Sequence, residues 1–138
     1  MLISTKGRYA LRVMIDLAEE GTEEYVALQH IADKEGISMK YLESIIVLLS
    51  KAGLLDGRRG KNGGYRLCRT PEEYSALEIL MLTEGALAPV TCLESETNTC
   101  ERAGHCPTLP MWEGLRKVIN EYLGNVTLAD LVKQGTTT

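Results

Sequence analysis

The stretch GISMKYLESIIVLLSKAGLLDGRRGKNGGYRL, residues 36–67, places a helical pattern directly before a hairpin pattern. Ser38 suits the N-cap of a helix that ends at Gly53, because its hydroxyl can accept a hydrogen bond from a free backbone N–H. Apolar residues recur along this helix every three or four positions, as a buried face requires: Leu42, Ile45, Ile46 and Leu49. Residues 54–67 then predict two short strands joined by a basic, glycine-rich turn.

Two further helices are predicted upstream of this stretch. Residues 7–21 and 26–36 each show a helical spacing of apolar residues, and each segment ends at a glycine. In the first helix this spacing defines one apolar face: Leu11, Met14, Ile15 and Ala18. Three helices with a tight turn between the second and the third are typical of a helix-turn-helix. The basic tip of the hairpin, with Arg58, Arg59 and Lys61, favours a winged DNA-binding domain over an ordinary helical domain with a surface hairpin.

The composition of the 138 residues fits one domain, or one small domain with an extension. No run approaches the roughly 18 apolar residues of a membrane span, and no secretory signal is evident. We therefore expect a cytoplasmic protein with reduced thiols and no membrane contact. The net charge is −4, but residues 1–66 carry ten Lys and Arg against nine Asp and Glu. The first half thus stays compatible with DNA binding, because the local field decides such contacts.

The second half predicts helices on either side of a cysteine segment. One helix follows Pro71, a long one runs from Pro110 to Asn125, and a short one begins after Thr127. The long helix carries an apolar stripe, for which a dimer interface is favoured over packing on its own domain: Trp112, Leu115, Val118, Ile119 and Tyr122. The expected organisation is a winged domain over 1–70, a connecting helix and turn over 71–91, a cysteine loop over 92–106, and dimerisation and C-terminal helices over 107–138.

A helix in the major groove reads base edges with its outward residues, so we expect Lys40, Glu43 and Ser44 to face the bases. Glu43 could equally be a solvated charge; as a contact it would accept a hydrogen bond from cytosine N4 and serve discrimination. Arg59 at the wing tip suits insertion into a narrow minor groove. Phosphate contacts, which read no sequence, are expected from these side chains: Arg58, Lys61, Ser4, Lys6 and Tyr9.

Three of the four cysteines, Cys92, Cys100 and Cys106, lie within fifteen residues before the long helix. A disulfide framework does not suit three thiols in a reducing compartment, and structural zinc needs four ligands with a close cysteine pair. An iron–sulfur cluster held by thiolates fits the wider spacing, and a metal-free thiol redox switch stays open. The remaining Cys68 ends a predicted wing strand, where we expect a small buried side chain.

A family resemblance is carried by four segments: ISTKGRYAL at 3–11, GISMKYLE at 36–43, GRRGKNGGYRL at 57–67 and NVTLADLV at 125–132. They resemble the Rrf-type winged-helix transcription regulators, most of all the IscR-type members, which bind an iron–sulfur cluster. The resemblance implies a homodimer in which the long C-terminal helix crosses to the partner, and palindrome-like operators in duplex DNA. It also implies a 2Fe-2S cluster on Cys92, Cys100 and Cys106 and, as partners, cluster-delivery proteins. Seven residues separate the first cysteine pair here, where family members more often have five.

The resemblance leaves the fourth cluster ligand open. IscR-type regulators take it from a histidine three residues after the last cysteine, where this chain has Leu109. Nitric-oxide sensors of the family use an acidic residue at a position where this chain has Arg8. Among the local alternatives we favour His105, because imidazole is a known cluster ligand. The others are carboxylates of the loop: Glu94, Glu96 and Glu101.

We therefore expect a DNA-binding transcription regulator that senses iron–sulfur or redox status and controls genes for iron–sulfur cluster assembly. Cluster assembly would order the loop, shift the packing of the dimer helix and move the two recognition helices relative to each other. The alternatives are a metal-free thiol redox or cysteine-metabolism repressor and, more distantly, an iron–sulfur electron carrier. An enzyme is not expected, because no Ser/His/Asp set, phosphate-binding glycine loop or carboxylate pair stands out in the sequence.

Overall fold

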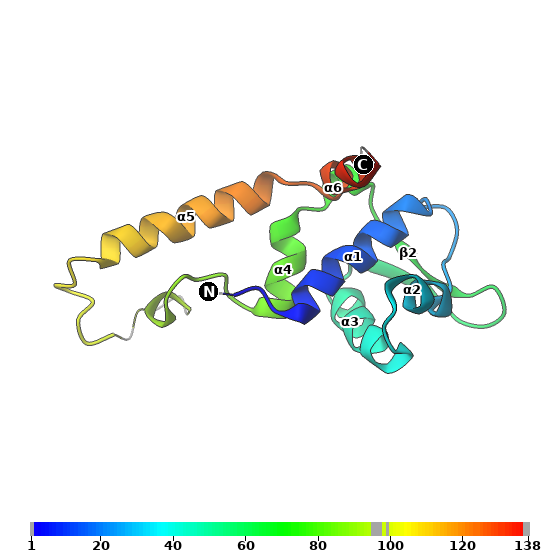
Figure 1. The fold of residues 1–138 in the computed structure, drawn as a ribbon, viewed down its shortest axis with the longest axis horizontal. Helices are drawn as coiled ribbons and strands as arrows, with labels where there is room; N and C mark the ends of the chain where they lie inside the picture. Colours follow the sequence, from blue (N-terminus) through cyan, green and yellow to red (C-terminus); the bar gives the residue numbers. More distant parts are fainter. Residues whose placement is uncertain (1, 95–97, 99, 137–138) are drawn as a thin grey trace.

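Three helices and a two-stranded hairpin build the first half of the chain in the computed structural model, which describes residues 2–94, 98 and 100–136 (Figure 1). The helices are α1 (Thr5–Glu19), α2 (Leu28–Glu35) and α3 (Met39–Lys51), and the antiparallel strands are β1 (Leu55–Arg58) and β2 (Gly64–Leu67). A 3-10 turn, η1 (Pro71–Glu73), leads to α4 (Ala76–Glu84), and a second, η2 (Thr91–Leu93), precedes α5 (Leu109–Asn125) and α6 (Leu128–Thr136). The chain is therefore mainly helical with a hairpin wing, as predicted.

Serine hydroxyls cap several of the helices. The Ser38 hydroxyl accepts a hydrogen bond from the Tyr41 N–H at 3.1 Å, which confirms Ser38 as the N-cap of α3. Ser4 and Ser75 cap α1 and α4 in the same way. The turn between α2 and α3 passes through Gly36, whose φ of 66° is a left-handed conformation that glycine adopts without strain. This turn separates α2 from α3 and changes the direction of the chain between them.

The hydrophobic core lies between α1, α3, the hairpin and the last helix. α3 buries the apolar face that its spacing predicts. α1 differs from the prediction, because part of its expected core face is only half-buried: Leu11, Ile15 and Ala18. The fully buried residues of α1 are the following: Ala10, Val13, Met14 and Leu17. Helices α4 and α6 pack on α1 in addition to α2 and α3, so apolar residues cover more than one side and spacing alone could not rank them.

The hairpin is joined to the helices through Val26. The Tyr65 N–H donates to the Val26 carbonyl at 2.9 Å, and the Val26 N–H donates to the Tyr65 carbonyl at 2.8 Å. Gly64 makes this close approach possible, because a Cβ at its position would collide with the Val26 carbonyl. Across the hairpin Leu55 pairs with Leu67, and both side chains are buried. The wing therefore has a fixed base on the core.

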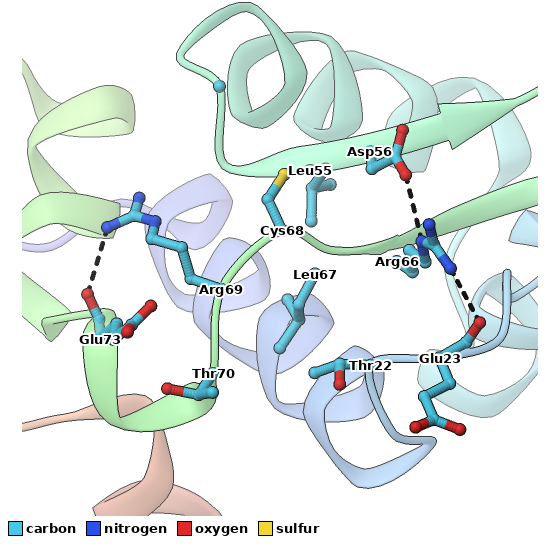
Figure 2. Close-up of a pocket in the computed structure, with 11 residues that line it drawn as sticks. Thr22, Glu23, Leu55, Asp56, Arg66, Leu67, Cys68, Arg69, Thr70 and Glu73 are labelled. Atoms are coloured by element: carbon cyan, nitrogen blue, oxygen red, sulfur yellow. Dashed lines mark hydrogen bonds and ion pairs between the residues drawn. The ribbon is translucent and has the colours of Figure 1, made fainter.

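Cys68 is exposed, so the expectation of a buried thiol at this position is wrong. Side chains alternate along an extended chain, and the preceding Leu67 is the one that faces the core. Cys68 instead lies in the wall of an open pocket of about 730 Å³ beside the wing (Figure 2). Arg66 and Arg69 lie in the same wall, and both are held there by hydrogen bonds to acceptors of the chain.

The second half of the chain is arranged around α1 and α4. α6 returns to α1, and its first residue, Leu128, is fully buried. The Leu128 N–H donates to the Tyr74 carbonyl at 3.0 Å, which ties α6 to the segment before α4. α5 contacts α4 but extends away from the body of the molecule, and none of its residues is buried (Figure 1). No helix of the described chain is long and apolar enough to cross a membrane.

Candidate DNA interface and cysteine loop

The outward face of α3 presents the predicted base-reading side chains. Lys40 and Glu43 are exposed, and within the described part of the chain neither side chain makes a hydrogen bond or an ion pair. Ser44 is half-buried, and its hydroxyl donates to the Tyr41 carbonyl at 2.6 Å, which leaves the oxygen lone pairs able to accept. These residues lie opposite the buried face of the helix and form a polar strip.

The tip of the wing holds Arg59 and Lys61. Both are exposed, and their charged groups have no intramolecular partner among the residues described. Gly60 and Asn62 adopt φ values of 92° and 66°, which turn the chain sharply between the two strands. Arg58 lies nearer the base of the wing, where its guanidinium sits over the Tyr25 ring at 5.8 Å. Arg58 thus contributes to holding the wing, whereas Arg59 and Lys61 stay available to a ligand.

The base of the wing is held by a polar network that the sequence did not reveal. The Tyr25 hydroxyl donates to Asp56 at 2.7 Å. The Arg66 guanidinium donates to the same carboxylate at 3.1 Å, as Figure 2 shows. The hydrogen bond from Tyr25, followed by that from Arg66, lowers the pKa of Asp56. Arg66 also lies over the Tyr25 ring, 4.3 Å from its centroid. Tyr25 and Asp56 are 31 residues apart, so no local pattern marks this network.

The N-terminal turn of α1 holds the other residues predicted to contact phosphate. The Ser4 N–H and hydroxyl donate to the Glu84 carboxylate at 2.6 and 2.8 Å, so Ser4 is engaged within the chain. Tyr9 packs edge-on against Tyr41, with ring centroids 6.0 Å apart, and therefore lies beside the start of α3. Lys6 is half-buried. Glu84 was not among the predicted site residues, since it becomes a neighbour of Ser4 only when α4 packs on α1.

The cysteine loop leaves the body of the molecule at η2 and ends at α5. Cys92 is half-buried in η2, next to the buried Leu93, whose carbonyl accepts a hydrogen bond from Arg116 of α5 at 3.4 Å. Cys100 is exposed, Cys106 is half-buried, and all three cysteines are free thiols. The start of the loop is therefore attached to α5, while the later thiols lie toward solvent.

The thiol of Cys106 has a lowered pKa. The largest cause is a hydrogen bond from the Thr108 hydroxyl, whose Oγ1 lies 3.3 Å from Sγ. Thiolates are the form that binds metal and reacts with oxidants, so the donor chemistry of the loop fits an iron–sulfur cluster. The side chains are not gathered, however: within residues 2–94, 98 and 100–136, no group of three or more His, Cys, Asp and Glu is placed to hold a metal ion.

The candidates for a fourth ligand are dispersed along the loop. His105 is exposed, and its backbone N–H donates to the Arg102 carbonyl at 3.1 Å. Glu94 and Glu101 are also exposed, and Glu96 lies outside the described residues. None of the described candidates joins the thiols in a common site.

Comparison with known proteins gives a family match over almost the whole chain. The Rrf2 family model, described as an iron-dependent transcriptional regulator, matches residues 3–134. The protein rrf2 of Nitratidesulfovibrio vulgaris is 36% identical over 133 residues, which cover 96% of this chain and 88% of that protein.

Solved structures of other regulators share this fold, and two of them are compared with this chain. CymR of Bacillus subtilis, described as the global cysteine regulator, superimposes with a TM-score of 0.78 at 35% identity, covering 97% of this chain and 98% of the other. The IscR structure of T. potens gives a TM-score of 0.76 at 36% identity, covering 98% and 88%. The chain is thus similar to a cysteine regulator and to IscR to nearly the same degree.

Proposed function

Because the chain belongs to the Rrf2 family of DNA-binding transcription regulators, we propose that it binds operator DNA as a homodimer and that Cys92, Cys100 and Cys106 set its affinity. It is a regulator and not an enzyme. The observation that carries the proposal is the position of the cysteine loop, which lies between α4, packed on the DNA-binding domain, and the protruding α5. A change in this loop would therefore act on the DNA-binding domain and on α5, the proposed dimer helix, together.

DNA reading is assigned to α3 and the wing. In the major groove, the Glu43 carboxylate would accept a hydrogen bond from the N4 amino group of cytosine. Lys40 and Ser44 lie beside it on the outward face of α3. Arg59 at the wing tip would enter the minor groove, where the negative potential is strongest over A·T tracts. The phosphate contacts are proposed for other side chains of the wing and for the N-terminal part of α1: Ser4, Lys6, Tyr9, Arg58 and Lys61.

Arg59→Ala tests the role of the wing. Operator affinity should fall several-fold near 100 mM salt, and the slope of log K against log salt should decrease by about one, because one cation is lost from the contact. Fluorescence anisotropy at several salt concentrations measures both. Lys117→Ala, which removes an exposed cation of α5, is the matched control and should change neither value. Unaltered binding by Arg59→Ala would exclude this residue from the interface.

The sensing group is proposed to be an iron–sulfur cluster, of the 2Fe-2S type, held by Cys92, Cys100 and Cys106. When bound, it supplies one-electron redox chemistry that depends on the protein environment. Two contacts of the chain hold the approach to this loop: Arg116 holds the start of the loop to α5, and Glu84 holds the end of α4, which precedes the loop, to Ser4. Genes for iron–sulfur cluster assembly are the proposed targets.

Anaerobic purification tests this sensor. Visible absorption with about two irons and two sulfides per chain is expected after reconstitution with iron and sulfide. Single Cys→Ala substitutions at 92, 100 and 106 should abolish the absorption, whereas Cys68→Ala should retain it, because Cys68 is an exposed thiol outside the loop. A colourless, iron-free wild-type protein after reconstitution would contradict the cluster.

A metal-free thiol switch is the second candidate, and the lowered pKa of Cys106 favours it. Hydrogen peroxide would oxidise the Cys106 thiolate to a sulfenate and would itself be reduced to water. The sulfenate would take up a proton, and a second loop thiol would attack its sulfur, form a disulfide and release water. Intact-mass measurement should show a loss of two hydrogens per chain. Cys106→Ser should prevent this loss, and Cys68→Ser should not. An unchanged mass of wild-type protein after oxidation would exclude the disulfide.

A further inference from the structure

The outward face of α3 carries an exposed aliphatic side chain among its polar residues. Val47 is 48% exposed, whereas the apolar residues of the opposite face are buried. It lies one helical turn after Glu43 and two turns after Lys40, which places it on the same strip of the helix surface. Val47 therefore does not belong to the core of this chain.

The position of Val47 distinguishes it from an ordinary exposed valine. Single exposed aliphatic residues are common on protein surfaces, so exposure by itself carries no argument. Here, however, Glu43 and Lys40 of the same strip have charged, exposed side chains without partners in the described chain. A DNA edge that these two side chains read would therefore lie along the face from which Val47 also projects.

The major groove offers an apolar group of its own, the C5 methyl of thymine. Valine suits contact with a methyl group, since its branched side chain is held in one rotamer in a helix and loses little conformational freedom on binding. A polar group at this position would instead select donors or acceptors. The strip thus combines two means of distinguishing bases. The Glu43 carboxylate would select a base by hydrogen bonding, and the Val47 methyl groups would select a base by shape and apolar contact.

We propose that Val47 is a specificity-determining residue that contacts the C5 methyl of a thymine in each operator half-site. This inference rests on the proposed DNA-binding role of α3. Glu43 and Val47 are four residues apart, which is about 6 Å along the helix axis, and base pairs are stacked about 3.4 Å apart. The thymine therefore lies within about two base pairs of the base that Glu43 contacts.

The experiment begins by selecting operator sequences from a random duplex library with the full-length dimer. Each thymine of the selected site is then replaced by deoxyuridine, which removes only the C5 methyl, and affinity is measured by fluorescence anisotropy. At one thymine per half-site, this replacement should lower the affinity of the wild-type protein by about fourfold, which is the effect of one buried methyl group. Val47→Ala should bind the thymine site less tightly and lose the response at that position alone.

Two controls keep the outcomes distinct. Val47→Ile preserves an aliphatic surface and should keep the deoxyuridine response, and circular dichroism should show that both variants are folded. An equal response of wild type and Val47→Ala at every position would overturn the proposal. So would a change in oligomeric state of Val47→Ala in sedimentation, because Val47 would then contact a second copy of the chain. Failure of the selection to enrich any sequence would count against the DNA-binding role itself.

Discussion

Tyr74 attaches the wing to the rest of the chain. Its side chain is fully buried, and its hydroxyl donates to the Leu54 carbonyl at 2.7 Å. The same oxygen accepts from the backbone N–H groups of Cys68 and Arg69 at 2.9 and 3.1 Å. Leu54 precedes β1 and Cys68 follows β2, so one hydroxyl holds both outer ends of the hairpin. Burial raises the pKa of this phenol, which therefore stays a hydrogen-bond donor at neutral pH.

Tyr74→Phe should lower the free energy of unfolding by about 2 kcal/mol, because backbone groups at both ends of the hairpin lose their partner. Urea denaturation measures the change. Tyr65→Phe is the matched control: Tyr65 also belongs to the hairpin, and among the described residues its hydroxyl makes no hydrogen bond. Equal midpoints for the two variants would contradict a special role for the Tyr74 hydroxyl.

Asp56 makes the stability of the wing dependent on acid. Hydrogen bonds from Tyr25 and Arg66 lower the pKa of Asp56 in the folded chain. The stabilisation of the folded state by this carboxylate is therefore complete above the ordinary carboxyl pKa near 4, and it is lost as the pH falls through the lowered pKa. Asp56→Asn should therefore lower the urea midpoint at pH 7, and the difference from wild type should shrink toward pH 3. Asp33→Asn, which removes an exposed carboxylate of α2, is the control. A constant difference between pH 7 and pH 3 would refute this assignment.

At the level of the elements, the C-terminal end of α4 contacts the N-terminal end of α1, and the chain continues from this end of α4 toward the cysteine loop. Glu84, the last residue of α4, accepts two hydrogen bonds from Ser4 at the positive end of the α1 dipole. Gly7 leaves room for this carboxylate, since a Cβ at that position would lie 2.5 Å from Glu84 Oε1. The turn of α1 proposed to contact phosphate is thus held by the helix that leads into the loop.

Glu84→Gln should loosen this N-terminal turn, because a neutral amide interacts less favourably with the helix dipole. Amide hydrogen exchange of residues 5–8 should become about two to five times faster, while exchange within α3 should stay unchanged. Glu24→Gln, a substitution of an exposed carboxylate outside α1 and α4, serves as the control. Unchanged exchange in residues 5–8 would show that the contact does not stabilise the turn.

At the scale of the whole molecule, the cysteine loop and the elements proposed to read DNA, α3 and the hairpin, lie toward opposite ends of the long axis (Figure 1). Between them α5 exposes a set of large apolar side chains: Met111, Leu115, Val118 and Tyr122. An aliphatic and aromatic stripe of this kind on a protruding helix is characteristic of an interface. Pairing through α5 would bring two recognition helices into one unit and cover the stripe.

Val118→Glu should convert the proposed dimer into a monomer, because Val118 is 61% exposed on one chain and a charge would be buried on pairing. Sedimentation velocity measures the mass. Operator affinity should fall on the order of a hundredfold, since two linked half-site contacts become separate binding events. Lys117→Ala should remain dimeric. A Val118→Glu protein that is still dimeric with wild-type affinity would place the interface elsewhere.

The local elements were predictable from sequence, because their signals are local. Ser38 as the cap of α3, the buried face of that helix and the strands flanking the glycine-rich turn follow from spacing and capping chemistry. The prediction of a buried Cys68 was wrong because the exposure of this side chain depends on the strand register, which turns the preceding Leu67 toward the core. The α1 face was misjudged because α4 and α6 pack on it from a distant part of the chain.

The winged helix-turn-helix and the family resemblance could be predicted from the sequence, since each rests on residue types at short spacing. Which polar groups meet depends instead on the tertiary structure: Tyr25 with Asp56, and Ser4 with Glu84. The tertiary structure also shows that the loop thiols are not gathered among the described residues. These features arise from contacts between segments far apart in the chain, and periodicity carries no information about such contacts.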